Sequence, residues 1–344
     1  MSVVSLSSPF PYVDLAPERI LTETVGLRPF RAAGPRLEIE SLGAKKLVHH
    51  YGHGGSGWSL SWGSAQAAAE LVKTLEVSSV AVIGCGAIGL TTARVLQQRG
   101  YRVTIYARDT PPGVTSSKAA GNWSPASRVC SPDRVTPQFG AWWERAAVFS
   151  FQQYRTLAAG VSAVHEVDNF RFGGPWELYP LERQLPLIAT FEEAQPFPAD
   201  RHPFDEDVLH SKTFVFDIPA HFQKLLSDFR AAGGVVQPRE FHSPAELTQL
   251  PEPCLVNCTG LGAKALFGDK TLQPIAGQLA KYPAHPTAYF KIDTPEGALV
   301  SRPDGIFVGG SADYDRWDTD PRPGVTQRTL NALLPLMAKL KQGR

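Results

Sequence analysis

One glycine-rich turn constrains this chain more than any other feature. Residues 80–89 read VAVIGCGAIG, a GxGxxG pattern that directly follows an apolar strand and opens a helix. Gly84 allows a tight turn, Gly86 lets the backbone approach a pyrophosphate, and Gly89 lets the helix pack on the strand. The N-terminus of the helix then faces the anion. In this context the pattern predicts a dinucleotide site, although a parallel α/β sheet can carry such a turn without a ligand.

The turn belongs to a βαβ unit with strands at 79–83 and 101–107 and a helix that ends near residue 99. Hydrophobic periodicity and turn residues predict the remaining elements. The middle of the chain, residues 114–212, is less periodic and rich in Trp, Pro and Phe, as in a binding domain with long loops. The other predicted strands are 20–30, 36–42, 214–216, 235–240 and 254–260, and the other helices are 59–75, about 217–232 and 327–340.

The bulk composition is that of a globular protein. Of the 344 residues, 43% are apolar, which is enough for a sizeable core, and the formal net charge of +1 favours neither nucleic acid nor a membrane surface as a partner. No apolar run is long enough to span a bilayer, and the start of the chain has no signal-peptide pattern. The four cysteines form no CxxC pair, so we expect no metal site and a reducing, cytoplasmic location. The C-terminal KLKQGR does not support a peroxisomal address.

The end of the second strand of the unit does not identify the dinucleotide. An acidic residue that binds the ribose is expected about twenty residues after the glycines. The strand ends in Ala107-Arg108-Asp109, so Arg108 or Asp109 could hold the adenosine ribose or a phosphate, or be a solvated strand end. FAD and NAD therefore both stay open at this point.

A second glycine cluster favours a flavin. Residues 51–59 read YGHGGSGWS and also open a helix. Backbone amides and a helix dipole at this place suit an anion, or a ring that becomes anionic when it is reduced. A nicotinamide enzyme has no need of this cluster, but a tight strand-to-helix loop would explain it without any ligand.

With both clusters in view, the chain resembles the D-amino-acid oxidase family of flavoproteins, which includes glycine-oxidase-like relatives. Five segments carry the resemblance, and together they are far more specific than the glycine pattern alone. They are VAVIGCGAIGLTTARVL, YARDTPPGVTSSKAAGNWSP, VNCTGLGAKAL followed by LQPIAGQ, VGLRPFRAAGPRLE, and HHYGHGGSGWSLSWGSAQAAAELV. The resemblance implies an α/β fold, with a Rossmann-like FAD-binding domain and a second, mixed-sheet substrate domain.

The segments stand in an order that differs from the family's. In the family the GxGxxG strand lies near the N-terminus, whereas GLRP and YGHGG lie near the C-terminus. Here GLRP (26–29) and YGHGG (51–55) come first. The order suggests a circular permutation, which predicts that the present chain ends lie at the surface and close together.

The resemblance also implies domain boundaries and site residues. The FAD-binding domain would comprise 31–125 and 213–270, the substrate domain 15–30, 126–212 and 271–325, with an N-terminal arm at 1–14 and a C-terminal helix at 326–344. Arg28 would bind the substrate carboxylate, which suits a guanidinium that pairs with two oxygens and stays charged, and Gly55 would lie beside the substrate. The implied FAD-binding residues are Gly54, Gly57, Trp58, Ser59, Gly84, Gly86, Gly89, Arg108, Asp109, Thr115, Ser116, Ala120, Gly121, Asn122, Phe241 and Gly260.

The substrate side departs from the family pattern. Ala298 stands where the family has a substrate-facing tyrosine, and the family's mobile lid is shortened to about 293–297. Trp123, Tyr314, Arg316 and Trp317 could line an altered pocket, or be core or surface residues. Substrate identity is therefore open, whereas flavin binding is not affected.

The reaction implied by the resemblance is oxidative deamination of a D-amino acid. Arg28 would anchor the carboxylate, and the α-hydrogen would leave as hydride to flavin N5. Dioxygen would reoxidise the flavin, giving peroxide, and the imine would hydrolyse to a 2-oxo acid and ammonia. No catalytic acid, base or metal is expected, and homo-oligomerisation stays open. The rivals are a flavin oxidase or dehydrogenase of glycine, N-alkyl or cyclic amino acids, an idle FAD-binding protein, and a nicotinamide-dependent dehydrogenase.

Overall fold

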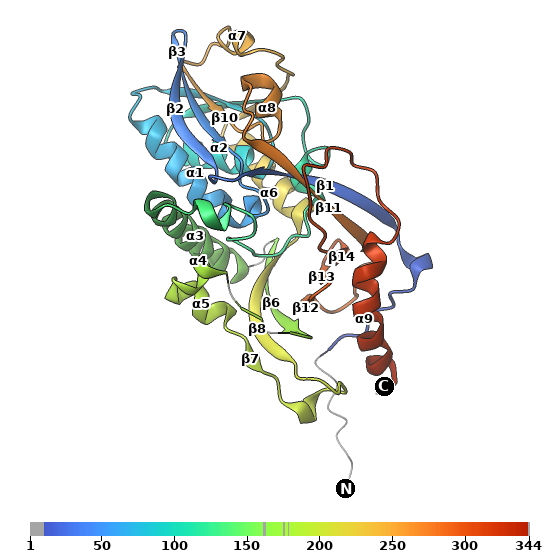
Figure 1. Ribbon diagram of the computed structural model, residues 1–344. Coiled ribbons are helices and arrows are strands. Elements are labelled where there is room, and N and C mark those ends of the chain that lie inside the picture. The colour runs from blue at the N-terminus through green and yellow to red at the C-terminus, as the bar shows by residue number, and fades with distance from the viewer. Residues whose placement is uncertain (1–9, 161–162, 175, 178, 343–344) are drawn as a thin grey trace.

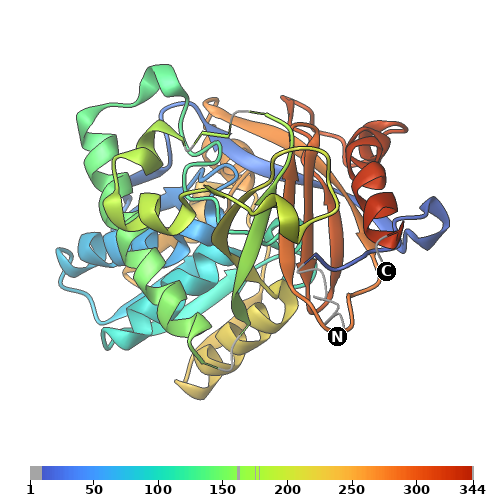
Figure 2. The ribbon, with the colours of Figure 1, turned by 90° about the horizontal axis from the view of Figure 1, so that it is seen from below.

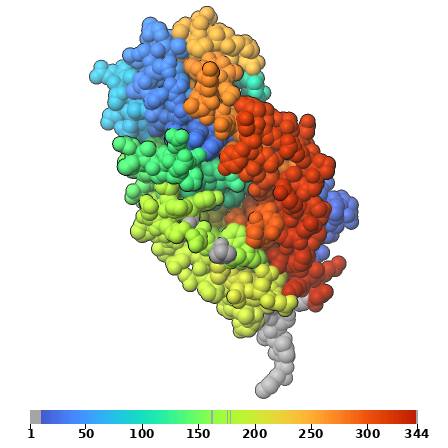
Figure 3. Space-filling model, viewed as in Figure 1, coloured from blue at the N-terminus to red at the C-terminus, as the bar shows by residue number. Residues whose placement is uncertain are grey.

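The computed structural model describes residues 10–160, 163–174, 176–177 and 179–342 (Figure 1). Its strands form two sheets, one of six strands and one of nine. Helices pack on both sheets, so the predicted mixed α/β class is confirmed. Figure 3 shows that the middle of the chain, in green and yellow, and the C-terminal segment, in red, meet on one face of the molecule.

The six-stranded sheet carries the glycine turn. All neighbouring strands in it are parallel except β2 and β3, which form an antiparallel hairpin. Parallel strands joined by helices are the expected result of the βαβ pattern. In spatial order the strands are β2 (Arg36–Leu42), β3 (Lys45–Tyr51), β10 (Cys254–Asn257), β4 (Ser79–Ile83), β5 (Arg102–Ala107) and β9 (Val235–Pro238).

Side-chain alternation along β4 shows how this sheet is covered on both faces. Val80 and Val82 point into the largest apolar cluster, which also contains residues of α1, α2, α3 and α6. Ala81 and Ile83 point the other way, towards a smaller cluster with Leu247 of α7. The helices are α1 (Gly57–Lys73), α2 (Ala87–Gln98), α3 (Pro137–Ala158), α6 (Ile218–Ala231), α7 (Pro244–Leu247) and α8 (Gly262–Phe267).

The nine-stranded sheet is mixed and lies beside the first (Figure 2). One face of it packs against α9 (Val325–Gln342) and residues 10–15, which share an apolar cluster with β11, β12, β13 and β14. In spatial order its strands are β1 (Thr22–Arg31), β11 (Leu272–Tyr282), β14 (Gly305–Gly309), β13 (Gly297–Arg302), β12 (Phe290–Thr294), β6 (Val164–Arg171), β8 (Leu209–Phe216) and β7 (Gln195–Pro196), and β15 (Asp313–Tyr314) pairs with β11.

Short helices complete the middle of the chain and the loops. The loop that follows β5 contains η2, and α4 and α5 pack near β8 of the nine-stranded sheet. They are η1 (Pro17–Arg19), η2 (Thr115–Lys118), η3 (Pro132–Arg134), α4 (Pro180–Arg183), α5 (Pro186–Glu192) and η4 (Ala199–Arg201). No helix of the described ranges is long and apolar enough to cross a membrane.

The first and last described segments lie against each other. The backbone N–H of Val13 donates a hydrogen bond to Sδ of Met337 in α9, 3.4 Å away. This contact fits the expectation that the two chain ends lie close together, although residues 1–9 and 343–344 are outside the described part. Phe10 is buried, so the expected arm at 1–14 is packed on the sheet from its tenth residue onward.

Candidate functional site

A cavity of about 890 Å³ opens between the two sheets. Its walls come from the carboxyl ends of β4 and β5, the amino ends of α1 and α2, and the face of the nine-stranded sheet opposite α9. The volume is at the upper end of the range for small-molecule sites. The position also agrees with the rule that open α/β sheets bind ligands beyond the carboxyl ends of their strands.

The glycine turn has the geometry that a pyrophosphate site needs. Gly84 has φ +110°, and a Cβ there would lie 2.6 Å from the carbonyl oxygen of Cys258. A Cβ on Gly89 would lie 2.1 Å from the Gly84 carbonyl oxygen, so only glycine lets α2 pack this closely on the turn. A Cβ on Gly86 would lie 3.2 Å from Ser116 Oγ, in the space between the turn and the next loop.

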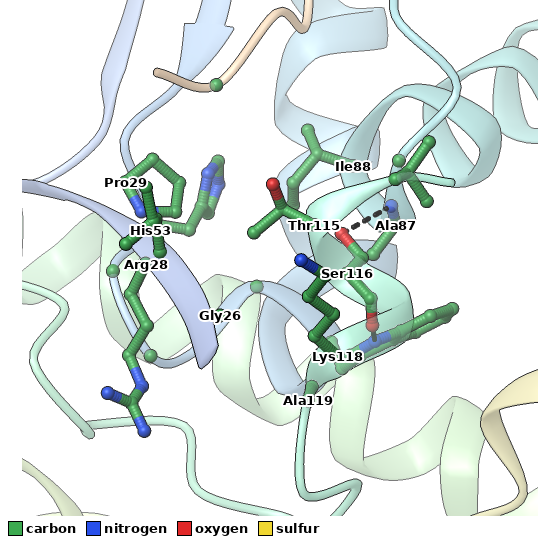
Figure 4. A pocket seen from close by; sticks show the side chains of 18 of the residues that line it. Gly26, Arg28, Pro29, His53, Ala87, Ile88, Thr115, Ser116, Lys118 and Ala119 are labelled. Atoms are coloured by element: carbon green, nitrogen blue, oxygen red, sulfur yellow. Dashed lines mark hydrogen bonds between the residues drawn. The ribbon is translucent and has the colours of Figure 1, made fainter. Parts of the chain in front are cut away.

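The loop after β5 closes over the amino end of α2. The Ala87 N–H donates to Ser116 Oγ at 3.1 Å, and the Trp58 indole N–H donates to the Ser116 carbonyl at 2.9 Å. Figure 4 shows Thr115, Ser116 and Lys118 on one side of the pocket, facing the segment of Arg28 and Pro29 on the other. One serine therefore ties together both helix ends predicted to face the cofactor.

The second glycine cluster is locked into place by β1 and by the loop at 124–128. Gly54 has φ +55°, and its N–H donates to the Pro29 carbonyl at 2.8 Å. A Cβ on Gly54 would lie 1.8 Å from the Arg128 carbonyl oxygen, and the Gly55 N–H donates to the Ser127 carbonyl at 3.1 Å. This close packing explains why glycine stands at position 54. It also holds the amino end of α1 at the cavity.

The two residues proposed for the ribose already interact with each other. Arg108 Nε lies 2.8 Å from Asp109 Oδ2, and Arg108 Nη1 lies 3.2 Å from Glu240 Oε1. The Arg108 side chain is 67% exposed, so its carboxylate partners can be exchanged for a ligand at little cost. Phe241 lies at the same end of the cavity, and the guanidinium of Arg239 stacks on its ring at 4.8 Å.

Arg28 enters the other end of the cavity from β1. Its guanidinium lies on Gly277 of β11, where a Cβ would be 2.2 Å from Nη1, and Nη1 donates to the Ser311 carbonyl at 3.2 Å. Burial, together with the nearby charge of Arg128, lowers the pKa of Arg28 to about 10. Among the described residues no carboxylate forms an ion pair with Arg28. A partly buried guanidinium without a counter-ion suits an anionic ligand.

Arg128 is a site residue that the sequence did not indicate. It has φ +52°, a strained conformation for a residue with a side chain, and its Nη1 donates to Ser127 Oγ at 3.1 Å. It lines the cavity and acts electrostatically on Arg28. Nothing in the local pattern SRVC marks it, because its role depends on a loop that reaches from the middle of the chain to the glycine cluster.

Nearly all of the predicted site residues line this one cavity. Two do not: Gly89 is packed behind the turn, and Ser59 is buried, with its Oγ accepting from the Ser124 N–H at 2.8 Å. Those at the cavity are Arg28, Gly54, Gly55, Gly57, Trp58, Gly84, Gly86, Arg108, Asp109, Thr115, Ser116, Ala120, Gly121, Asn122, Phe241 and Gly260.

The residues considered for an altered substrate pocket divide between cavity and surface. Trp123, Trp317 and Ala298 line the cavity. Tyr314 is 59% exposed and packs edge-on against Phe30 instead. Arg316 forms an ion pair with Asp318 and does not reach the cavity.

The histidines near the second glycine cluster form a buried network. Nε2 of His50 and Nε2 of His53 lie 2.6 and 2.7 Å from Ser64 Oγ, and Thr92 Oγ1 lies 3.1 Å from His50 Nδ1. Burial lowers the pKa of His50 well below its usual value and that of His53 to about 3. Both rings are therefore neutral at pH 7. Within the described ranges, no group of His, Cys, Asp or Glu side chains has the arrangement of a metal site.

These buried histidines predict that the protein loses stability in mild acid. Burial also lowers the pKa of His221 to about 4, whereas the pKa of a histidine in the unfolded chain is about 6.5. The unfolded chain therefore binds protons first as the pH falls below about 6.5, and each buried histidine costs up to about 1.4 kcal/mol per pH unit. We expect the free energy of unfolding in urea to fall from about pH 6.5 to pH 4.5 as the unfolded chain takes up these protons. The substitution His221→Leu should reduce this slope, and an unchanged slope would contradict the assignment.

Comparisons with known proteins identify the family of this chain. Residues 79–343 match the model of the DAO family, described as FAD dependent oxidoreductase. The chain is 31% identical to a D-amino-acid oxidase of Rubrobacter xylanophilus, with 78% of this chain and 80% of the relative covered, and 30% identical to one of Streptomyces coelicolor, with 75% and 78% covered. A human D-aspartate oxidase is 26% identical over 72% of each chain.

A solved structure shows the same fold at lower identity. It is the L-amino acid deaminase of Proteus vulgaris with its specific insertion sequence deleted, at a TM-score of 0.53 and 15% identity, with 76% of this chain and 75% of that one covered. The family match spans more than half of the chain, and its first matched residue, Ser79, begins β4, the strand before the glycine turn. The chain belongs to the D-amino-acid oxidase family of FAD-dependent oxidoreductases and is an enzyme of that family.

Proposed function

We propose that this enzyme binds FAD and oxidatively deaminates D-amino acids, with dioxygen as electron acceptor. One amino acid, one dioxygen and one water would give a 2-oxo acid, ammonia and hydrogen peroxide. The observation that carries the proposal is the partly buried guanidinium of Arg28, which has no carboxylate partner among the described residues and lies in the same cavity as the glycine turn.

The residues at the glycine turn fit the cofactor. The backbone cradle at Gly84 and Gly86 is open where a Cβ would close it, and the amino end of α2 adds a favourable dipole for a pyrophosphate. Arg108 and Asp109, which follow β5, would hold the adenosine ribose, and Phe241 would contact the adenine, since all three line the cavity. The amino end of α1, with Gly57 and Trp58, would lie against the isoalloxazine ring.

The chain's own groups bind and orient the substrate. Arg28 pairs with the carboxylate and thereby fixes the position of the α-carbon, and Arg128 adds positive charge at the same point. Trp58 and Trp123, both almost fully buried, exclude water from the cavity wall. When bound, FAD supplies the two-electron acceptor for the substrate's Cα–H bond. We assign no side chain as acid or base, because a neutral amine can release its own proton to water.

Oxygen-electrode and peroxide assays on the FAD-loaded protein test the reaction. The panel should contain paired D- and L-amino acids, glycine, N-methyl amino acids and D-proline, each with dioxygen and with an artificial electron acceptor. We expect oxygen uptake and peroxide in equal amounts with D-amino acids, and little turnover of their L-enantiomers. Turnover only with the artificial acceptor would indicate a flavin dehydrogenase instead. Turnover only with glycine, N-methyl amino acids or D-proline would indicate a flavin enzyme for those amines.

We also propose that the order of segments is a circular permutation. The family match begins at residue 79, yet the preceding residues supply Arg28 on β1, which pairs along its whole length with β11. They also supply β3, which lies inside the six-stranded sheet between β2 and β10. An N-terminal extension is not expected to supply both a full-length edge strand of one sheet and an internal strand of the other.

A rearranged chain tests the permutation. It would begin at Ser78, continue to Gln342, and join through a short Gly/Ser linker to residues 10–77. Because Val13 contacts Met337 in α9, such a linker has little distance to span. We expect this rearranged chain to bind FAD. Its unfolding temperature should lie within a few degrees of that of the chain in its present order. An insoluble or cofactor-free product would count against the permutation, provided that the original order behaves normally in parallel.

A further inference from the structure

The face of the nine-stranded sheet that lines the cavity has an open floor beyond Arg28. Leu279 of β11, Gly309 of β14, Ala298 of β13 and Asp293 of β12 are successive partners across the sheet, and all four line the cavity. The two middle residues have almost no side chain, so they leave a trough along this row. The guanidinium of Arg28 lies over Gly277, two residues before Leu279 and on the same face.

The far end of the trough is strongly charged. Asp293 Oδ2 lies 2.6 Å from Lys291 Nζ and 3.7 Å from Arg171 Nε, and it accepts a hydrogen bond from Asn169 Nδ2 at 3.1 Å. The side chains of these three charged residues are at most 16% exposed. Both cations are therefore already engaged with one carboxylate.

Two further carboxylates, from the short helices α4 and α5, line the same end of the cavity. Glu182 accepts hydrogen bonds from the backbone N–H groups of Ala126 and Tyr179, each at 3.3 Å. Glu192 is 6% exposed, and its Oε2 has no hydrogen-bond partner among the described residues. A buried carboxylate without a hydrogen-bond partner destabilises the fold. A ligand group in the cavity can supply that partner and remove the cost.

The charges at this end do not balance. Three carboxylates (Glu182, Glu192 and Asp293) face two cations (Lys291 and Arg171), so a proton or a further cation is needed. Burial and the neighbouring Glu182 raise the pKa of Glu192 to about 8, which favours the protonated form of its carboxyl at neutral pH. A ligand cation could take the place of that proton and would gain a charge-assisted hydrogen bond.

The length of the trough suits a long, basic side chain. Neighbouring strands are about 4.8 Å apart, so Asp293 lies about 14 Å across the sheet from Leu279. A ligand whose carboxylate is bound by Arg28 therefore needs a long side chain, such as that of lysine or arginine, to bring its terminal group to the charged end.

We propose that the substrate class of this enzyme is D-amino acids with a terminal ammonium or guanidinium group, and that Glu192 is the specificity-determining residue that receives this group. The inference rests on the proposed function, since it requires the substrate carboxylate to bind Arg28. A dicarboxylic amino acid is disfavoured, because its side chain would have to displace Asp293 from Lys291 or Arg171 beside two other carboxylates.

Ligands that cannot be oxidised at an α-amine test the inference independently of turnover. Calorimetric titration of the FAD-loaded protein with 6-aminohexanoate, hexanoate and adipate compares a terminal ammonium and a terminal carboxylate at the same chain position with a methyl-ended chain one atom shorter. We expect 6-aminohexanoate to bind at least about 10-fold more tightly than the other two. Equal binding of hexanoate, or tightest binding of adipate, would overturn the proposal.

Substitution of Glu192 tests its role. Glu192→Gln keeps the shape but removes the charge, and it should reduce the preference for 6-aminohexanoate over hexanoate to less than about 3-fold. Glu193→Gln removes an exposed neighbouring charge and should leave the preference unchanged. A preference that survives Glu192→Gln would refute this residue's assignment. If Glu192→Gln does not fold, the three ligands on the unaltered protein still decide the substrate class.

Oxidation assays separate this inference from the proposed function. Turnover of D-norleucine but not of D-lysine would contradict the basic substrate class and leave the oxidase proposal standing. Absence of turnover with every amino acid, together with tight binding of 6-aminohexanoate, would contradict the oxidase proposal and leave the assignment of the trough standing.

Discussion

Replacing Arg28 with glutamine is expected to lower kcat/KM by about 10²- to 10³-fold for every amino acid that the enzyme oxidises, since losing one partner of a buried charge pair costs about 3–4 kcal/mol. The guanidinium is held by the Ser311 carbonyl and by packing on Gly277, and it forms no ion pair with a carboxylate of the described residues. Its loss therefore removes a substrate contact and not a structural ion pair. Steady-state kinetics, with FAD content and unfolding temperature measured on the same preparations, check this result.

Two further variants make the Arg28 experiment specific. Gly277→Ala places a Cβ where the guanidinium now lies, so the charge remains but is displaced, and KM should rise more than kcat falls. Arg19→Gln removes an exposed arginine that pairs with Asp14, and it should change nothing. If Arg28→Gln retained full kcat/KM, the carboxylate site would have to lie elsewhere in the cavity.

Gly89→Ala is expected to abolish FAD binding. The added Cβ would meet the Gly84 carbonyl oxygen at 2.1 Å, and this neighbour is backbone that cannot rotate away. The amino end of α2 must therefore move off the turn, which misplaces the amides that face the pyrophosphate. Overpacking of this kind costs about 1–3 kcal/mol or more, so the unfolding temperature should also fall by several degrees. Absorbance at the flavin bands of the purified, FAD-supplemented protein measures the first effect, and thermal unfolding measures the second.

Gly140→Ala is the matched control for that substitution. Gly140 lies in α3 with an ordinary φ, and a Cβ added there would meet none of the described atoms beyond its own helix within 4 Å. Alanine should therefore be tolerated or slightly stabilising at this position. If Gly89→Ala bound FAD as well as Gly140→Ala, close packing at the glycine turn would not be what positions the cofactor.

The sequence predicted the half of the fold around the glycine turn well, because its signals are local. The strand at 79–83 agrees with β4 to the residue, and the helices predicted around 59–75 and 217–232 agree with α1 and α6 to within two residues. The pattern of apolar residues and the glycines at the turns determine these elements over short spans.

The middle of the chain was much less predictable. Residues 137–158 form the 22-residue helix α3, in a region where the sequence shows little periodicity and predicts only long loops. Its buried face is built from Trp143, Phe151, Tyr154 and small residues, and it packs closely on α1. Tertiary packing, and not a strong local pattern, specifies this helix.

The charged end of the trough could not have been predicted from the sequence. Glu182 and Glu192 lie on two short helices, whereas Lys291 and Asp293 lie on β12, about a hundred residues later in the chain. Only the pairing of β12 with β6, and the packing of α4 and α5 near that edge, bring these groups to one cavity. Ala298 is a departure from the family pattern that the sequence already reveals, but the open floor that it leaves becomes visible only in the sheet.

The visible spectrum of the FAD-loaded protein without oxygen, before and after addition of D-amino acids, tests the central claim most directly. We predict flavin absorption bands that bleach within the mixing time of the experiment with D-lysine or D-arginine, more slowly with neutral D-amino acids, and hardly at all with L-lysine. A protein that holds FAD but is not bleached by any D-amino acid, or one that fails to bind FAD at all, would contradict the account.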